Sequence, residues 1–137
     1  MATFTWDASL DVGIPEIDAQ HREMTDIIAT LHEAYRAGRE RDVLAELINR
    51  INEYAQMHFA TERRYMEPVA DAIPNYEKHM QEHREFFSDA IGFLLRYLDN
   101  GATITPELLD YLAEWWFRHI RGTDQVMGRV LREKGIV

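Results

Sequence analysis

The amino-acid sequence predicts an all-α protein: an antiparallel, up-down-up-down four-helix bundle with an N-terminal arm and a short C-terminal helix. Only four prolines and seven glycines interrupt its 137 residues, so long helices can form. Apolar residues recur at helical spacing in four segments, and the short loops between these segments favour antiparallel neighbours. The length suits one domain of ordinary size, so we expect residues 1–137 to form a single domain.

The first half of the chain is predicted to contain the arm and two helices. Residues 1–17 lack a helical stripe and should form the arm. Asp18 is placed to be the N-cap of a helix over residues 18–37, because apolar residues at helical spacing follow it directly. A second helix is expected over residues 42–66, and Pro68 lies just past its end.

The second half is predicted to contain two further long helices and the short one. A third stripe runs over residues 75–98 and stops before Gly101. The fourth helix is expected over residues 106–121, because Pro106 suits the first position of a helix. The short C-terminal helix is expected over residues 123–133.

Histidines occupy all four apolar stripes, at positions that an antiparallel bundle brings to one end. The start of the first helix, the end of the second, the start of the third and the end of the fourth lie together in that topology. These segments carry His21, His58 with Glu62, His79 with His83, and His119. His32 lies about 16 Å further along the first helix, at 1.5 Å per residue, and is expected to lie outside this layer.

Such a cluster predicts a metal centre. Buried imidazoles and carboxylates cost several kcal/mol without compensation, and a bound cation supplies it. Glu62 follows His58 by four residues, as His83 follows His79, so each pair shares a helix face. The predicted ligands are His21, His58, Glu62, His79, His83, His119 and Asp124.

Asp124 is the least regular member of this set. It follows His119 by five residues, which on an ideal helix turns it about 140° away. We therefore expect the fourth helix to end or distort near Gly122 and return Asp124 to the cluster. The alternative is that Asp124 caps the short final helix.

Composition narrows the function further. The net charge of −9 argues against nucleic acid and anionic membranes as partners. The chain has no cysteine, so a metal must be held by nitrogen and oxygen ligands, which suits iron, manganese, zinc or copper. Seven such ligands fit two ions better than one. The N-terminus lacks the pattern of a signal peptide and no apolar run reaches membrane length, so a cytoplasmic protein is expected.

The sequence resembles the hemerythrins, in particular the small single-domain bacterial type. The resemblance rests on the lead-in W...L.VGI..ID.QH and on HFATE, HMQEH and HIRGTD, which are similar to the family motifs HxxxE, HxxxH and HxxxxD. It implies two non-haem iron ions bridged by Glu62, Asp124 and an oxo or hydroxo group. It also implies that one ion is held by His79, His83 and His119, and the other by His21 and His58.

By this resemblance, the expected function is reversible binding of dioxygen for transport, storage or local supply, without enzymatic activity. Dioxygen would bind at the ion with fewer histidines, and Met24, Phe59 and Trp116 are candidates to line its pocket. One departure from many relatives is Arg63, where they carry a second acid after the bridging glutamate.

Two other functions fit parts of the sequence. HMQEH matches an inverted zinc-protease motif with Glu82 as general base, but this leaves the other five predicted ligands unexplained. Helical geometry instead makes Glu82 a solvated surface acid. A stand-alone oxygen or redox sensor, or a scavenger with weak peroxidase or nitric oxide chemistry, would use the same site. The ferritin-like di-iron oxygenases are disfavoured because the sequence has no Glu-x-x-His.

Overall fold

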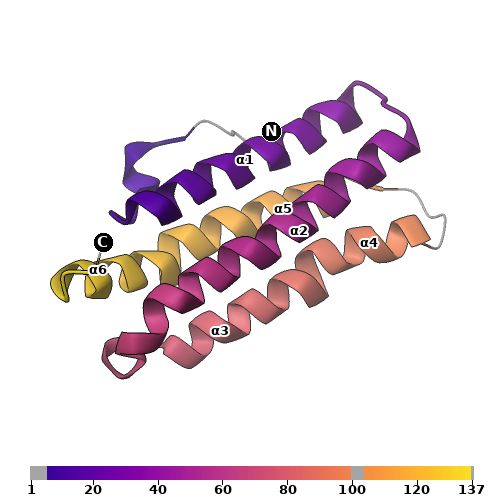
Figure 1. The fold of residues 1–137 in the computed structure, drawn as a ribbon. Helices are drawn as coiled ribbons and strands as arrows, with labels where there is room; N and C mark the ends of the chain where they lie inside the picture. The colour runs from indigo at the N-terminus through magenta and orange to yellow at the C-terminus, as the bar shows by residue number, and fades with distance from the viewer. Residues whose placement is uncertain (1–5, 100–103, 137) are drawn as a thin grey trace.

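The computed structural model describes residues 6–99 and 104–136, and within them the chain forms an all-α antiparallel four-helix bundle (Figure 1). Two of the long helices are regular and two contain a π-helical segment. In chain order they are α1 (Pro15–Arg36), α2 (Arg41–Met66), the run α3 (Tyr76–Glu85), η3 (Phe86–Ala90) and α4 (Ile91–Asp99), and the run α5 (Pro106–His119), η4 (Ile120–Asp124) and α6 (Gln125–Glu133). The predicted fold class is confirmed.

The N-terminal arm contains one short 3-10 turn, η1 (Ala8–Leu10), and packs against the start of α1. The predicted N-cap is wrong, because α1 begins at Pro15 and Asp18 lies inside its first turn. The Asp18 carboxylate accepts hydrogen bonds from the backbone N–H groups of Val12, at 2.7 Å, and Gly13, at 3.1 Å. Proline suits the first helical position, so the helix starts there and Asp18 instead fastens the arm.

A 3-10 segment, η2 (Glu67–Ala72), follows α2 and leads into α3. Asn75, with φ of 65°, adopts the left-handed conformation just before α3 begins. Figure 1 shows that η2, the start of α1 and α6 lie at the same end of the bundle. This is the end at which the sequence predicts the histidines to meet.

The short C-terminal helix α6 follows α5 without a non-helical break. His119, Asp124 and Gln125 all have right-handed helical backbone angles, so the π segment η4 joins the two helices. Gly128 lies where the arm crosses α6: a Cβ there would lie 2.4 Å from the Val12 carbonyl oxygen. Glycine is required for this close approach.

Two apolar clusters fill the bundle and leave a layer between them. The larger contains Met24, Phe59 and Ile120, while the smaller contains Ile17 and Met66. His21 lies in sequence between Ile17 and Met24, and Glu62 between Phe59 and Met66. The predicted ligands therefore occupy a polar layer with apolar packing on both sides.

Candidate metal centre

All seven predicted ligands meet in this layer. Each is at most 7 % exposed, and they come from α1, α2, α3, α5 and η4. His32, the sixth histidine, is not among them; its Nε2 lies 3.5 Å from Oδ1 of Asp110. The seven side chains form two groups that share both carboxylates.

The first group contains three histidines. The Nε2 atoms of His79 and His83 lie 3.2 and 2.9 Å from Oε1 of Glu62. Oδ1 of Asp124 lies 3.0 Å from Nε2 of His79 and 3.2 Å from Nε2 of His119. Three imidazole nitrogens and one oxygen from each carboxylate thus surround one position.

The second group contains two histidines. Oε2 of Glu62 lies 3.1 Å from Nε2 of both His21 and His58. Oδ2 of Asp124 lies 3.2 Å from Nε2 of His21. Each carboxylate therefore presents one oxygen to each group, which is the arrangement of a ligand that bridges two cations.

The π segment explains how Asp124 reaches the cluster. A π turn closes between residues i and i+5, as an α turn closes between i and i+4. His119, at the end of α5, and Asp124, at the end of η4, are five residues apart, and across the π segment this spacing aligns them as four-residue spacing aligns His58 and Glu62 in α2. The predicted distortion near Gly122 is present, and Asp124 faces the histidines as part of η4.

The electrostatics of the cluster favour added positive charge. Burial alone lowers the pKa of an imidazole, but hydrogen bonds to Asp124 and Glu62 and their negative charges raise the pKa of His21 to about 9 and that of His79 to about 10. For His83, burial dominates and lowers the pKa to about 4. Burial also acts to raise the pKa of Glu62 and Asp124, yet the surrounding imidazoles hold both well below the usual range.

Several buried polar atoms of the cluster approach only one another and lack a partner with hydrogen-bond geometry among the described residues. They include Nε2 of His58 and His119 and both carboxylate oxygens of Asp124. Buried polar atoms of native proteins are almost always satisfied, so these atoms call for a partner other than protein. A set of imidazole nitrogens and carboxylate oxygens suits a transition-metal cation, and the residues present fit such an ion.

Two of the predicted ligands form hydrogen bonds with residues outside the cluster. Oε1 of Glu82 accepts from Nδ1 of His119 at 2.7 Å and from the Thr123 hydroxyl at 2.9 Å. Oε1 of Gln20 accepts from Nδ1 of His58 at 2.8 Å. Partners of this kind fix the orientation of a metal-binding imidazole.

The prediction that Glu82 is a solvated surface acid is therefore wrong. Its side chain is 20 % exposed and is directed at α5 and η4, and burial acts to raise its pKa, but hydrogen bonds from His119 and Thr123 lower it. Helical geometry within α3 misled the prediction, because Glu82 forms its hydrogen bonds with His119 of α5 and Thr123 of η4. No signal within α3 indicates which neighbour that face meets.

The aromatic side chains divide between the two groups. The Trp116 ring packs edge-on against both His21 and His58, with centroids 5.5 and 5.6 Å away. Its Nε1 donates to the hydroxyl of Thr25 at 3.0 Å, which fixes the ring. Phe59 instead stacks on His83, with centroids 4.0 Å apart. Of the proposed lining residues, Trp116 thus lies against the two-histidine group and Phe59 mainly against the other.

Within residues 6–99 and 104–136, no helix is both long and apolar enough to cross a bilayer.

Comparison with known proteins identifies the family. The family of the hemerythrin HHE cation binding domain matches residues 12–131. A bacteriohemerythrin of Stenotrophomonas maltophilia is 34 % identical over 125 residues, which cover 91 % of this chain and 79 % of that protein. A bacteriohemerythrin of Clostridium acetobutylicum is 26 % identical over 129 residues, 89 % of this chain and 96 % of that protein.

The fold is also similar to that of a solved protein. A crystal structure of a leucine-to-phenylalanine mutant aligns with a TM-score of 0.82 over 96 % of this chain and 98 % of that one, at 23 % identity. The family match covers nearly all of the bundle and all seven side chains of the cluster. The resemblance noted in the sequence is confirmed, and the chain belongs to the hemerythrin family.

Proposed function

We propose that the seven-residue cluster holds two iron ions and that the protein binds dioxygen reversibly, as a carrier, store or local supply, without acting as an enzyme. Membership of a cation-binding family supports a metal centre. The observation that carries the proposal is the division of each carboxylate between the two histidine groups. One shared residue from α2 and one from η4 thereby tie two metal positions together.

The residues assign a different number of ligands to each ion. His79, His83 and His119 would hold one ion, and His21 and His58 the other, with Glu62 and Asp124 binding both. The first ion thus has five protein ligands and the second has four. The second ion keeps more room for an external ligand, so the two-histidine group is where we place dioxygen binding.

A pair of ferrous ions would supply the electrons needed to hold dioxygen and take them back on its release. The chain's own residues make this reversible by protecting the site. Glu62 and Asp124 are 0 % exposed, and Trp116 covers the rings of both His21 and His58. Exclusion of water and of bulky reductants from such a site prevents competing reactions.

The test is a cycle of oxygenation and release. Purified protein is loaded with iron, its metal content is measured, it is reduced without oxygen, and visible spectra are recorded under air and again under argon. We expect about two iron ions per chain and a charge-transfer band that appears with oxygen and fades under argon. Replacing Glu62 with Ala should abolish both signals, whereas Glu53→Ala, an exposed change on the same helix, should preserve them.

A spectrum that passes directly to an oxidised form and is not reversed by argon would contradict reversible binding. That outcome would favour the alternative of a sensor, or of a scavenger with weak peroxidase or nitric oxide chemistry. An iron content near zero after loading would contradict the metal assignment itself.

A further inference from the structure

We propose that a cavity between α2 and α3, beside His83, binds a small organic carboxylate through Arg63, Arg84 and the Nδ1–H of His83. The cavity has a volume of about 290 Å³. Its lining includes Phe59, Met80, His83, Phe87, Arg63 and Arg84. The inference rests on the proposed function in one respect, since Nδ1 of His83 carries hydrogen when Nε2 binds a metal ion.

His83 is the ligand whose imidazole lacks support on the side away from the cluster yet borders a cavity. Its Nε2 faces Glu62 at 2.9 Å, and its ring stacks on Phe59. By contrast, Nδ1 of His58 and Nδ1 of His119 each have an acceptor, on Gln20 and Glu82. No described residue accepts a hydrogen bond from Nδ1 of His83.

The Nδ1 atoms of His21 and His79 also have no hydrogen-bond partner among the described residues, but both atoms are fully buried. His83 differs because the residue is 7 % exposed and forms part of the cavity wall. An acceptor from outside the protein can therefore reach His83 alone among these three. A metal-bound imidazole normally has such an acceptor.

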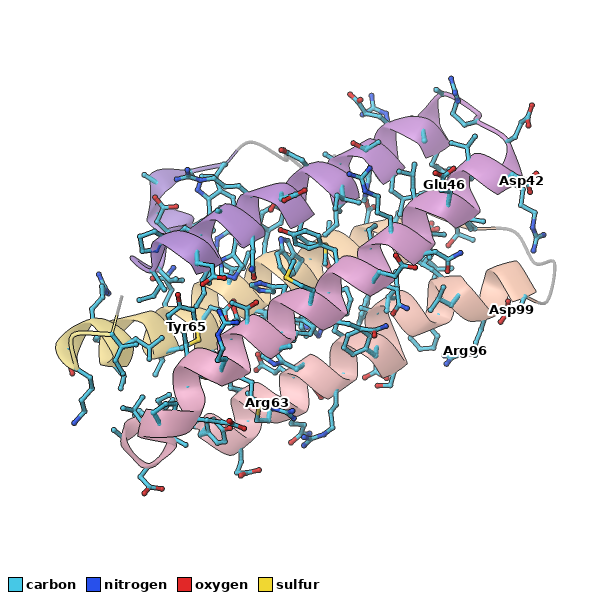
Figure 2. All side chains as sticks on the ribbon, in the orientation of Figure 1. Asp42, Glu46, Arg63, Tyr65, Arg96 and Asp99 are labelled. Atoms are coloured by element: carbon cyan, nitrogen blue, oxygen red, sulfur yellow. The ribbon has the colours of Figure 1, made fainter. Side chains whose placement is uncertain are left out.

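Two guanidinium groups supply the charge that a carboxylate needs. Arg63 is near the end of α2, on the part of the helix next to α3 in Figure 2, and Arg84 lies on α3. Both side chains are exposed, and neither forms an ion pair with a described residue. Other arginines of this acidic protein do find acids: Arg22 pairs with Asp11 at 3.1 Å and Arg64 with Glu16 at 3.2 Å.

The apolar side chains of the cavity indicate which group the carboxylate of the ligand should carry. Phe59, Met80 and Phe87 are apolar, so they suit a short aliphatic or aromatic body better than a hydrated inorganic anion. Guanidinium groups bind the flat carboxylate by paired hydrogen bonds. A monocarboxylate about the size of benzoate fits both demands.

Such a ligand would act on the metal centre through His83. A carboxylate that accepts from Nδ1 makes the imidazole a stronger donor to the ion in the three-histidine group. The cavity therefore gives an external molecule a route to influence the cluster that does not compete with dioxygen at the two-histidine group.

The experiment is a calorimetric titration of benzoate into the 137-residue chain loaded with zinc, an ion that accepts imidazole and carboxylate ligands and has no redox chemistry. We expect saturable binding, a loss of at least tenfold in affinity for Arg63→Ala and for Arg84→Ala, and no change for Arg64→Ala, whose side chain lies outside the cavity. The neutral analogue benzamide should not compete. A change in the ¹⁵N resonance of His83 Nδ1 on addition of benzoate should accompany binding.

Absence of saturable binding, or equal affinity in all three arginine variants, would overturn the proposal. Inorganic phosphate that binds as tightly as benzoate would overturn the assignment to an organic carboxylate. Because zinc-loaded protein needs neither iron nor dioxygen, failure of the oxygenation cycle with intact benzoate binding would count against the proposed function alone. Intact oxygenation without benzoate binding would count against the cavity alone.

Discussion

The three-histidine group and the two-histidine group share both carboxylates but have different surroundings. Two members of the three-histidine group line cavities: His83 lines one, and His119 lines another of about 510 Å³ together with Glu82. Both histidines of the two-histidine group instead contact the Trp116 ring, and Gln20 accepts a hydrogen bond from His58 through its neutral amide.

This difference indicates that the two groups have different roles. The shared carboxylates would couple the two proposed metal positions, because removal of either carboxylate takes one ligand from each group. The number of histidines and the side chains around each group would then determine which external molecules can reach it. Under the two proposals above, the group with more protein ligands would respond to a molecule bound at the surface, and the group with fewer would bind dioxygen.

The largest effect is expected from a shared carboxylate. Glu62→Ala removes one oxygen from each group and also one of the two carboxylate charges that balance the cations, so both metal positions should be lost and the iron content should fall from about two ions per chain to near zero. Elemental analysis after loading and desalting measures this. Retention of one tightly bound ion would show that the two groups do not depend on each other.

Single histidine replacements should separate the groups. His58→Ala leaves three protein ligands in its group, whereas His83→Ala leaves four in the other. We expect the first variant to keep about one ion per chain and the second about two, because divalent transition metals bind poorly with few protein ligands. The same stoichiometry in both variants would contradict the difference drawn here.

Loss of a hydrogen bond between a predicted ligand and a residue outside the cluster should have a smaller effect on metal binding. Glu82→Gln replaces the negative acceptor that faces Nδ1 of His119, at 2.7 Å, with a neutral amide, and mutation of such a partner weakens metal affinity by about 10- to 100-fold. Competition with a chelator of known affinity measures the change. Glu85→Gln is the matched control, since Glu85 lines the same cavity but makes no hydrogen bond with the cluster. Equal effects of the two variants would assign the result to the charge of the cavity.

The smallest effect is expected at Trp116, whose ring contacts both histidines of the two-histidine group. Trp116→Phe deletes the hydrogen bond to Thr25 and leaves a small void, which together should lower the free energy of unfolding by about 1–2 kcal/mol. Urea unfolding measures this. The iron content should stay at about two ions per chain, while oxidation that argon does not reverse should become faster. Trp115→Phe, which affects the ring stacked on His119, should leave that rate unchanged if the two groups differ as described.

Much of the site could be predicted because its information lies in helical spacing. His58 with Glu62 and His79 with His83 are four residues apart, and an antiparallel bundle brings their ends together whatever the details of packing. The sequence likewise shows the irregular spacing of His119 and Asp124. It indicates a distortion near Gly122 but not its kind. A π segment forms only when contacts with the surrounding helices stabilise the rotated position of Asp124.

Contacts between different segments of the chain were harder to predict from the sequence. Asp18 looks like a helix cap by its position, but the fold of the arm places the N–H groups of Val12 and Gly13 within its reach. Glu82 looks like a surface acid until α5 and η4 pack beside α3 and present His119 and Thr123.

The sequence by itself determined the four helices, the end of the bundle at which the ligands gather, and the family. Periodicity and short loops are local properties, and they suffice to bring distant segments into one layer. Only the tertiary structure decided which carboxylate oxygen faces which histidine, which imidazole is supported and which borders a cavity. Those features depend on the rotation of each helix about its axis, which is set by side-chain packing across the whole bundle.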